Sequence, residues 1–270
     1  MRVFFLLAAF STAVSLAEES PVGVDGSTPP DGTPWDNSAA APTPPPPREK
    51  GDASKLLSQG EREFREKKHD AAVRLFSEAL AATDVPALRV RVLYARHKAF
   101  VSLSRIPSAI TDLTAALEIE PTHVMALLMR GNLNLITGAC RSAEADFARV
   151  LTADPTKRDA LARQPHAVEC RAALERAEYA RRANQPHAVR VALGEAMAEG
   201  RATAASSLLL ERAEVSMQIG GEGDIEDALA DLAKVIKMDS NNVKAYALRG
   251  RALLKHGDYP TGENPAVAPS

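Results

Sequence analysis

Residues 124–155 read VMALLMRGNLNLITGACRSAEADFARVLTADP. The stretch contains two apolar, alanine-rich and leucine-rich segments, and Gly138 lies between them. Asp154-Pro155 closes the second segment, because proline removes the backbone donor that a continuing helix would need. The stretch therefore predicts a helical hairpin, with one helix on either side of a short turn.

The same pattern recurs along the chain at intervals of 34 to 37 residues. The equivalent residues in three successive copies are Gly60, His97 and Gly131; Phe64, Val101 and Leu135; Ala72, Ala109 and Ala143; and Phe76, Leu113 and Phe147. A repeat of this length, with a small residue in the first helix and an alanine and an aromatic or leucine residue in the second, is typical of tetratricopeptide (TPR) repeats. The sequence therefore predicts an all-α fold, a TPR α-solenoid in which antiparallel helix pairs form a right-handed superhelix.

The spacing of the repeats divides the rest of the chain. We expect TPR repeats 1–3 in residues 51–155, and in residues 156–259 a long helix, repeats 4 and 5 and the first helix of a sixth repeat. Pro165 is expected at the first position of a helix, where its missing donor costs nothing. Residues 220–223, with three glycines, are expected to form an inserted turn. Residues 260–270 contain three prolines and are expected to be a disordered tail.

The N-terminal 17 residues combine Arg2, an apolar run from Val3 to Phe10, and small residues up to Ala17. This order predicts a signal peptide cleaved after Ala17, because the apolar run is shorter than the roughly 20 residues that a membrane span needs. Residues 18–50 are rich in proline and are expected to form a disordered linker, in which Trp35 is an incidental exposed residue. We therefore expect a chain in the endoplasmic reticulum lumen or outside the cell, without membrane association after cleavage.

Two cysteines, Cys140 and Cys170, would favour a disulfide in such a compartment. The repeat register, however, places Cys140 at the start of a second helix and Cys170 near the start of the next first helix. Successive antiparallel helices put these two ends roughly 15 to 20 Å apart, too far for a bridge. We therefore expect two free, mostly buried thiols.

Several classes of function are not expected. A formal net charge of -2 leaves no basic excess for nucleic acid. The sequence has no Gly-rich phosphate loop and no His-Glu-x-x-His motif, so we expect no enzymatic activity and no cofactor. His166 and His187 share a pentapeptide, but their separation of 21 residues does not suggest a metal site.

The first helices of TPR repeats line the inner groove, so their exposed positions predict the binding residues. These positions hold an apolar stripe, and the predicted client-binding residues are Leu57, Phe64, Tyr94, Val101, Met125, Leu128 and Met129. Methionines are flexible and suit varied apolar ligands. Core packing is the alternative for Phe64, and His97, at a glycine position, is expected to widen its helix contact or to point outward. The groove is therefore expected to bind extended apolar segments of unfolded proteins.

Some TPR grooves hold a C-terminal carboxylate with a clamp of Lys, Asn and Arg. The corresponding positions here are Leu57, Glu61, Ala95, Met125 and Met129. None of these side chains can bind a carboxylate. We therefore do not expect the ligands of that clamp.

The chain has a family resemblance. It rests on residues 109–113 (AITDL) and 228–232 (ALADL), the expected signal peptide, the first repeat block and the long helix after that block. The chain resembles the endoplasmic reticulum co-chaperones of the DnaJ homolog subfamily C member 3 family over about residues 52–259. The resemblance implies binding of unfolded clients and an indirect connection to the luminal Hsp70 through a J domain. The sequence contains no His-Pro-Asp, so we expect a chain that lacks the J domain. A secreted or periplasmic TPR scaffold for one dedicated partner is the alternative.

Overall fold

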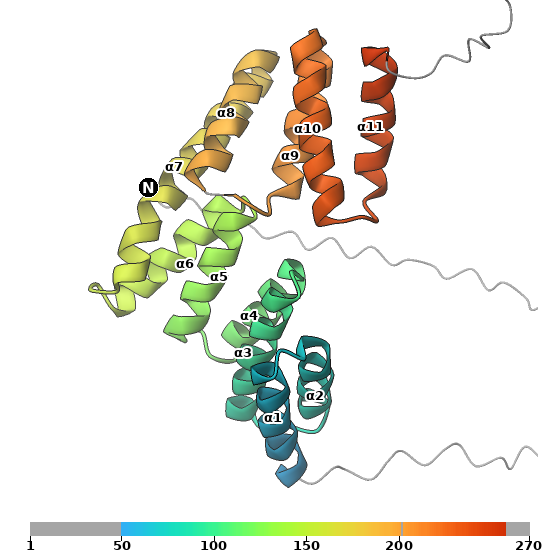
Figure 1. The fold of residues 1–270 in the computed structure, drawn as a ribbon. Coiled ribbons are helices and arrows are strands. Elements are labelled where there is room, and N and C mark those ends of the chain that lie inside the picture. Colours follow the sequence, from blue (N-terminus) through green and yellow to red (C-terminus); the bar gives the residue numbers. More distant parts are fainter. Residues whose placement is uncertain (1–49, 201, 258–270) are drawn as a thin grey trace, which may run out of the picture. The chain divides into compact units, whose positions relative to one another are not determined.

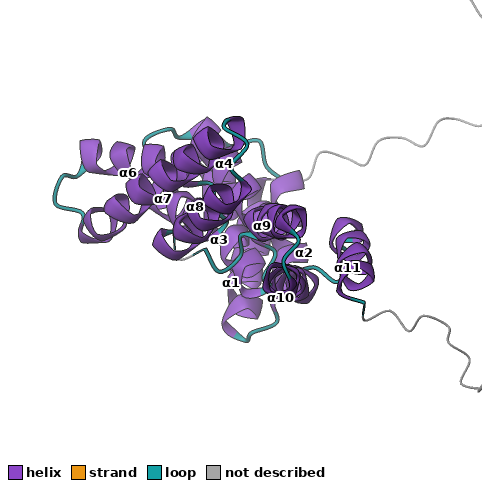
Figure 2. Cartoon of the chain, turned by 90° about the horizontal axis from the view of Figure 1, so that it is seen from above, coloured by secondary structure: helices purple, strands orange, loops and turns teal. Residues whose placement is uncertain are grey.

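The computed structural model describes residues 50–200 and 202–257, and within these ranges it contains eleven α-helices and no strand (Figures 1 and 2). The all-α fold predicted from the repeat is therefore confirmed. The expected signal peptide (1–17), nearly all of the expected linker (18–50) and the expected tail (260–270) lie outside the described residues.

Ten of these helices form five hairpins, and the eleventh follows them. The helices are α1 (Lys50–Arg65), α2 (His69–Ala81), α3 (Pro86–Ser102), α4 (Ile106–Ile119), α5 (Val124–Ile136), α6 (Cys140–Ala153), α7 (Arg158–Arg182), α8 (Pro186–Glu199), α9 (Ser206–Ile219), α10 (Glu222–Met238) and α11 (Val243–His256). Each helix packs against the helix before it and the helix after it in the sequence. Most of the stabilisation of such an array comes from these neighbouring contacts.

A glycine in the first helix of a hairpin accommodates a phenylalanine from the second. A Cβ atom at Gly60 would lie 2.5 Å from Cε1 of Phe76, and one at Gly131 would lie 2.8 Å from Cε1 of Phe147. Both rings are almost fully buried. The absence of a Cβ atom therefore lets the helices of these hairpins close around a large ring.

In the second hairpin the large ring belongs to the first helix. His97 occupies the glycine position and is only 3% exposed, and the smaller Leu113 replaces the phenylalanine. The expectation that the ring points outward is therefore wrong, whereas a wider helix contact stays a prediction. Leucine is smaller than phenylalanine, so Leu113 offsets part of the volume that the imidazole adds relative to glycine.

An Arg–Asp pair that the sequence analysis missed recurs in three hairpins. Each arginine donates two hydrogen bonds of 2.6 to 2.8 Å to the two carboxylate oxygens; the pairs are Arg96–Asp112, Arg130–Asp146 and Arg212–Asp231. The aspartates are buried. Since a buried carboxylate without a partner is costly, these bidentate pairs help to fix the two helices of each hairpin against each other.

Two of these arginines also reach the preceding hairpin. Nη1 of Arg96 donates to the Ser77 hydroxyl at 2.8 Å, and Nη1 of Arg130 donates to the Thr114 hydroxyl at 3.2 Å. In each case one guanidinium connects three consecutive helices. For Arg212 the equivalent position on α8 is Gly194, which has no hydroxyl.

The two cysteines form a disulfide, and the expectation of free thiols was wrong. The Cα atoms of Cys140 and Cys170 are 5.8 Å apart. Cys140 begins α6, but Cys170 lies near the middle of α7, because α7 begins at Arg158 and is 25 residues long. Since α6 and α7 are antiparallel, the middle of the longer helix reaches the level of the first turn of α6.

Two further expectations need correction. Pro165 lies inside α7 and not at the first position of a helix. The expected four-residue turn is shorter, because α10 begins at Glu222 and leaves Gly220 and Gly221 between the helices. Gly220 has φ of 83°, a left-handed conformation that favours glycine at the end of a helix.

Candidate functional site

Two of the seven predicted client-binding residues are core residues. Leu57 is 3% exposed and packs in a cluster with Phe76 and Val92, and Leu128 is 1% exposed in the core around Phe147. Their side chains fill the contacts between helices. The position of a residue within its repeat does not distinguish such core residues from residues that face the groove. We therefore remove them from the surface available to a ligand.

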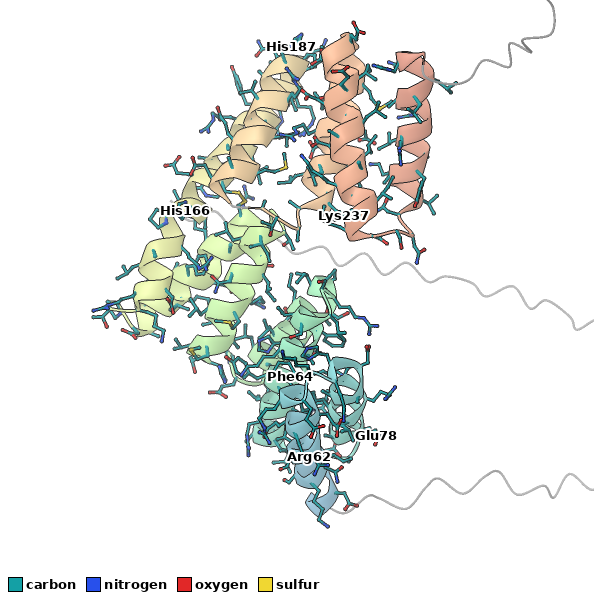
Figure 3. All side chains as sticks on the ribbon, viewed as in Figure 1. Arg62, Phe64, Glu78, His166, His187 and Lys237 are labelled. Carbon is teal, nitrogen blue, oxygen red and sulfur yellow. A yellow bond between two sulfur atoms is a disulfide. The ribbon has the colours of Figure 1, made fainter. Side chains whose placement is uncertain are left out.

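The other five predicted residues are wholly or partly accessible. Val101 and Met125 are each 39% exposed, whereas Phe64, Tyr94 and Met129 are half-buried. Tyr94 and Met129 pack against the core cluster around Phe147. Phe64, on α1, packs against the cluster that contains Leu57 and Phe76 (Figure 3). A role of these five residues in client binding stays a prediction.

Tyr94 lies among aromatic and basic side chains. Its ring centroid is 4.6 Å from that of His97 and 5.4 Å from that of His123, and Nζ of Lys98 is 4.7 Å from its centroid. Burial raises the pKa of Tyr94 and lowers the pKa of His97 to about 4, so both groups are uncharged at neutral pH. The surroundings of Tyr94 therefore offer the partly exposed rings of Tyr94 and His123 and one ammonium group to a ligand, whereas His97 is buried.

A larger groove lies elsewhere, and sequence analysis missed it. Its volume is about 1410 Å³, and it is lined by the start of α4, the end of α5, and parts of α8, α9 and α10. Its aliphatic lining residues are Ile106, Ile110, Ile136, Met197, Leu209 and Met238. It is larger than the 300 to 1,000 Å³ usual for small-molecule pockets, so its size suits a polypeptide segment.

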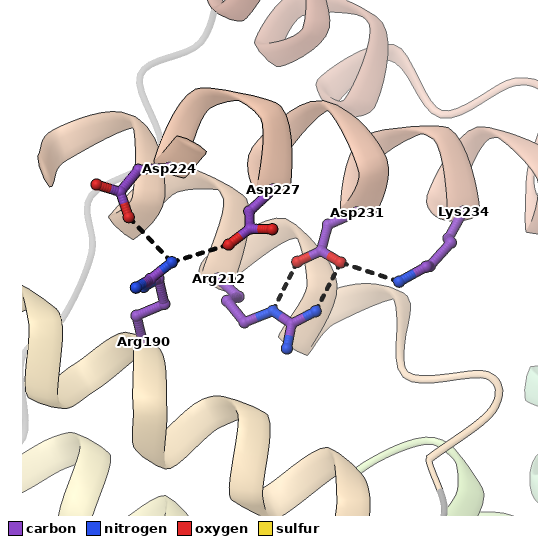
Figure 4. A network of polar contacts seen from close by, with 6 residues as sticks. All are labelled: Arg190, Arg212, Asp224, Asp227, Asp231 and Lys234. Carbon is purple, nitrogen blue, oxygen red and sulfur yellow. Dashed lines mark hydrogen bonds and ion pairs between the residues drawn. The ribbon is translucent and has the colours of Figure 1, made fainter. Parts of the chain in front are cut away.

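Three basic residues and one acidic residue, Asp239, line this groove. Arg212 and Lys234 line it but are both paired with Asp231 (Figure 4). Lys237, near the end of α10, also lines the groove and makes no ion pair with any residue that the structure describes (Figure 3). A carboxylate on a bound segment would therefore find an available cation beside the aliphatic lining.

The groove could not be found from the repeat alone. Its walls come from hairpins two to five, and most of its aliphatic residues belong to second helices or helix ends. The predicted binding residues all lie at first-helix positions of the first three repeats. Met197 and Met238 are the sequence signal for this groove, because methionines suit varied apolar ligands.

The described residues also bear on other kinds of site. In residues 50–200 and 202–257, no group of three or more His, Cys, Asp or Glu residues is arranged to hold a metal ion. His166 and His187 lie at distant points of the hairpin formed by α7 and α8 (Figure 3). No helix in the same ranges combines the length and apolar character needed to cross a membrane.

Comparison with known proteins supports the repeat assignment. The tetratricopeptide repeat family matches residues 94–158 and 220–264. DnaJ homolog subfamily C member 3 of Rattus norvegicus is 25% identical over 177 residues, which cover 62% of this chain and 32% of the relative. The chain thus spans about a third of the length of that relative.

A solved structure shows the same fold. The crystal structure of the P58(IPK) TPR domain superimposes with a TM-score of 0.61 at 24% identity, over 77% of this chain and 56% of that chain. The first TPR of Spaghetti (RPAP3) bound to an HSP90 peptide gives a TM-score of 0.42 at 21% identity, over 47% of this chain and 99% of that chain. The second similarity is too low to bear on ligands. The chain therefore carries tetratricopeptide repeats, and its repeat region is similar to that of DnaJ homolog subfamily C member 3.

Proposed function

We propose that the chain is a non-catalytic, co-chaperone-like TPR protein that binds extended apolar segments of unfolded proteins in the secretory pathway. The observation that carries the proposal is the groove of about 1410 Å³ with aliphatic walls and hydroxyl groups between them. An extended segment exposes side chains on both sides and backbone groups that need hydrogen bonds. The aliphatic residues suit the side chains, and the hydroxyl groups of Ser206 and Ser207 suit the backbone.

The similarity to a DnaJ homolog supports this proposal, because it places the chain near a protein named for a chaperone family. The exposed Val101 and Met125 add a second apolar surface on the first three repeats. Unfolded clients present many apolar segments at once. Two weak sites on one chain would therefore bind such a client more tightly than either site alone.

The secretory location rests on two independent features. The sequence predicts a signal peptide over residues 1–17, and the Cys140–Cys170 disulfide is typical of oxidising compartments. The endoplasmic reticulum lumen and the cell exterior both meet this requirement. Fractionation of cells that express the full chain, followed by detection of cleavage after Ala17, would test the location.

Suppression of aggregation tests the binding function. Purified residues 18–270 are mixed with a chemically denatured globular protein as it is diluted out of denaturant, and light scattering is followed. We expect less scattering with the chain than with an equal mass of an inert protein. A chain that does not reduce scattering at a several-fold molar excess would contradict the proposal and would favour a scaffold for one dedicated partner.

Two pairs of variants separate the two surfaces. Ile106→Glu with Met238→Glu places charges in the groove, and Tyr94→Glu with Met125→Glu places them on the first three repeats. Met238 and Met125 are exposed at 41% and 39%, so these two changes are compatible with folding. We expect the groove pair to remove most of the suppression. If only the Tyr94 and Met125 pair does so, the first three repeats carry the client site instead.

A further inference from the structure

The last described helix, α11, has apolar residues on two opposite sides. One side, with Ala245, Leu248 and Ala252, is buried in the cluster formed with α9 and α10. The other side is exposed: Val243 is 81%, Tyr246 48% and Leu254 63% accessible. At 3.6 residues per turn, the residues of this second side form one line along the helix together with Gly250. We call Val243, Tyr246, Gly250 and Leu254 the α11 stripe.

Gly250 lies at the centre of the α11 stripe, at the position that Gly60 and Gly131 occupy in their own repeats. In those repeats a phenylalanine ring from the next helix lies within 2.8 Å of the place where a Cβ atom would be. At Gly250 a Cβ atom would meet nothing within 4 Å. The α11 stripe therefore has the glycine that receives a large side chain, but no residue of the described chain fills the space.

The charges beside the α11 stripe have one sign. α11 contains no Asp or Glu, and Arg249 and Arg251 lie on either side of Gly250 in the sequence. Both arginines are exposed and make no ion pair with other residues of the described ranges. A second copy of α11 on the α11 stripe would bring four arginines together, which is unfavourable. Charge complementarity therefore favours a partner with acidic residues.

We propose that the α11 stripe binds an amphipathic helix of a partner protein. That helix carries an alanine and, four residues later, a phenylalanine or leucine that lies over Gly250, with acidic residues on both sides. This is the pattern of Ala72 and Phe76 in the first hairpin of this chain. Residues 257–270 contain no such pair, so this part of the sequence does not supply the helix.

This binding mode differs from the proposed function in ligand and in place. The groove is suited to an extended segment and is lined by α4, α5 and α8 to α10, whereas the α11 stripe is suited to a helix. Helix-in-groove recognition is read through anchors spaced by three, four and seven residues. The separations among Val243, Tyr246, Gly250 and Leu254 match that spacing.

A peptide derived from this chain provides the probe. The sequence of residues 222–239, with Leu232→Phe, has Ala228 four residues before the new phenylalanine, and it carries six acidic residues against two lysines. We label this peptide with a fluorophore and titrate it with residues 18–270 while following anisotropy. We expect saturable binding that becomes weaker as salt is added, because the arginines contribute electrostatically.

Gly250→Leu tests the empty space without harming the fold. Leucine is a better helix former than glycine and a Cβ atom has room here, so the melting temperature is expected to rise by about 2 to 4 °C. The leucine fills the space meant for the phenylalanine, and binding of the peptide is expected to fall at least about tenfold, as for a hot-spot residue. Gly223→Leu is the matched control, because Gly223 also lies in a helix with open space, and this change should leave binding unaltered.

Charge reversal tests the partner's acidity. Arg249→Glu with Arg251→Glu is expected to weaken binding of the peptide and to remove its salt dependence. Equal binding by the unchanged chain and Gly250→Leu would overturn the proposal, as would no saturation up to about 1 mM chain. A dimer of the chain that Tyr246→Glu dissociates in sedimentation would instead assign the α11 stripe to a second copy. None of these changes touches the groove, so aggregation suppression should persist in every variant.

Discussion

Replacing Gly194 with serine should stabilise the protein through a specific hydrogen bond. Gly194 lies inside α8, at the position where the first two hairpins have Ser77 and Thr114. Those two hydroxyls accept hydrogen bonds from Arg96 and Arg130. A Cβ atom at Gly194 would lie 3.4 Å from Nη1 of Arg212, which is ordinary contact. A serine hydroxyl would therefore reach the guanidinium without displacing it.

The expected magnitude comes from two effects. Gly→Ala in a helix interior stabilises by about 1 kcal/mol, and serine is about 0.5 kcal/mol less favourable than alanine. A hydrogen bond to a charged group contributes at least about 1.5 kcal/mol when it is partly shielded from water. We therefore expect Gly194→Ser to raise the free energy of unfolding by about 2 kcal/mol, and Gly194→Ala to raise it by about 1 kcal/mol.

Urea denaturation monitored by circular dichroism measures the free energy of unfolding of both variants. The decisive result is which of the two variants is more stable. Helix propensity alone makes serine less stabilising than alanine, so only the new hydrogen bond can reverse the order. A serine variant less stable than the alanine variant would refute the reasoning. Repeating the pair with Arg212→Lys, which removes the planar guanidinium, should restore the order set by propensity.

Three further changes follow from the packing. Cys140→Ser with Cys170→Ser opens a loop whose ends are 30 residues apart in the sequence, and it should lower the free energy of unfolding by about 3.6 kcal/mol in urea denaturation. A loss below about 1 kcal/mol would argue against the disulfide. In Gly131→Ala the new Cβ atom would lie 2.8 Å from Phe147, so this change should lower the free energy of unfolding by about 1 to 3 kcal/mol. Adding Phe147→Leu should recover part of that loss if the contact is the cause, and melting curves compare the single and double variants. Burial lowers the pKa of His97 to about 4 in the folded chain, against about 6.5 when unfolded, so unfolding takes up a proton as the pH falls. Stability should then be full above pH 6.5 and drop by about 2 kcal/mol by about pH 5, whereas His97→Met should show a smaller drop over the same range; equal slopes would exclude His97 as the source.

The fold could be predicted from sequence because the signals that define a helical hairpin are local. Gly131 and Phe147 lie on adjacent helices, and their spacing repeats at Gly60 and Phe76. Helix lengths are less local, and the position of Cys170 was misjudged because α7 begins at Arg158 and continues through Pro165. Proline inside a helix is usually costly, so the sequence favours a long helix that begins at Pro165 over one that continues across it.

The candidate site could be predicted only in part, for a different reason. Tyr94 and Leu128 both occupy first-helix positions that were assigned to the groove, yet one is half-buried and the other is 1% exposed. Which side of a first helix becomes core depends on the hairpins before and after it. The residues of the larger groove depend on four hairpins together, so Ile106 and Met238 carry no common signal in the sequence.

The Arg–Asp pairs and the disulfide have complementary places in the array. Arg96 joins the first two hairpins through Ser77, and Arg130 joins the second and third through Thr114. At the next junction the equivalent arginine, Arg176, pairs with Glu195 on its own hairpin and has no such contact with α6.

The disulfide joins α6 and α7 at this same junction. In a linear array each junction must resist opening by itself, because no distant contact supports it. The covalent bond therefore secures the junction at which the equivalent arginine makes no hydroxyl contact, and it adds there to the ion pairs Arg171–Glu144 and Arg141–Glu175. Reduction should increase amide hydrogen exchange first in α6 and α7, before exchange rises in α3 and α4. A uniform increase along all hairpins would mean that the junctions do not open independently.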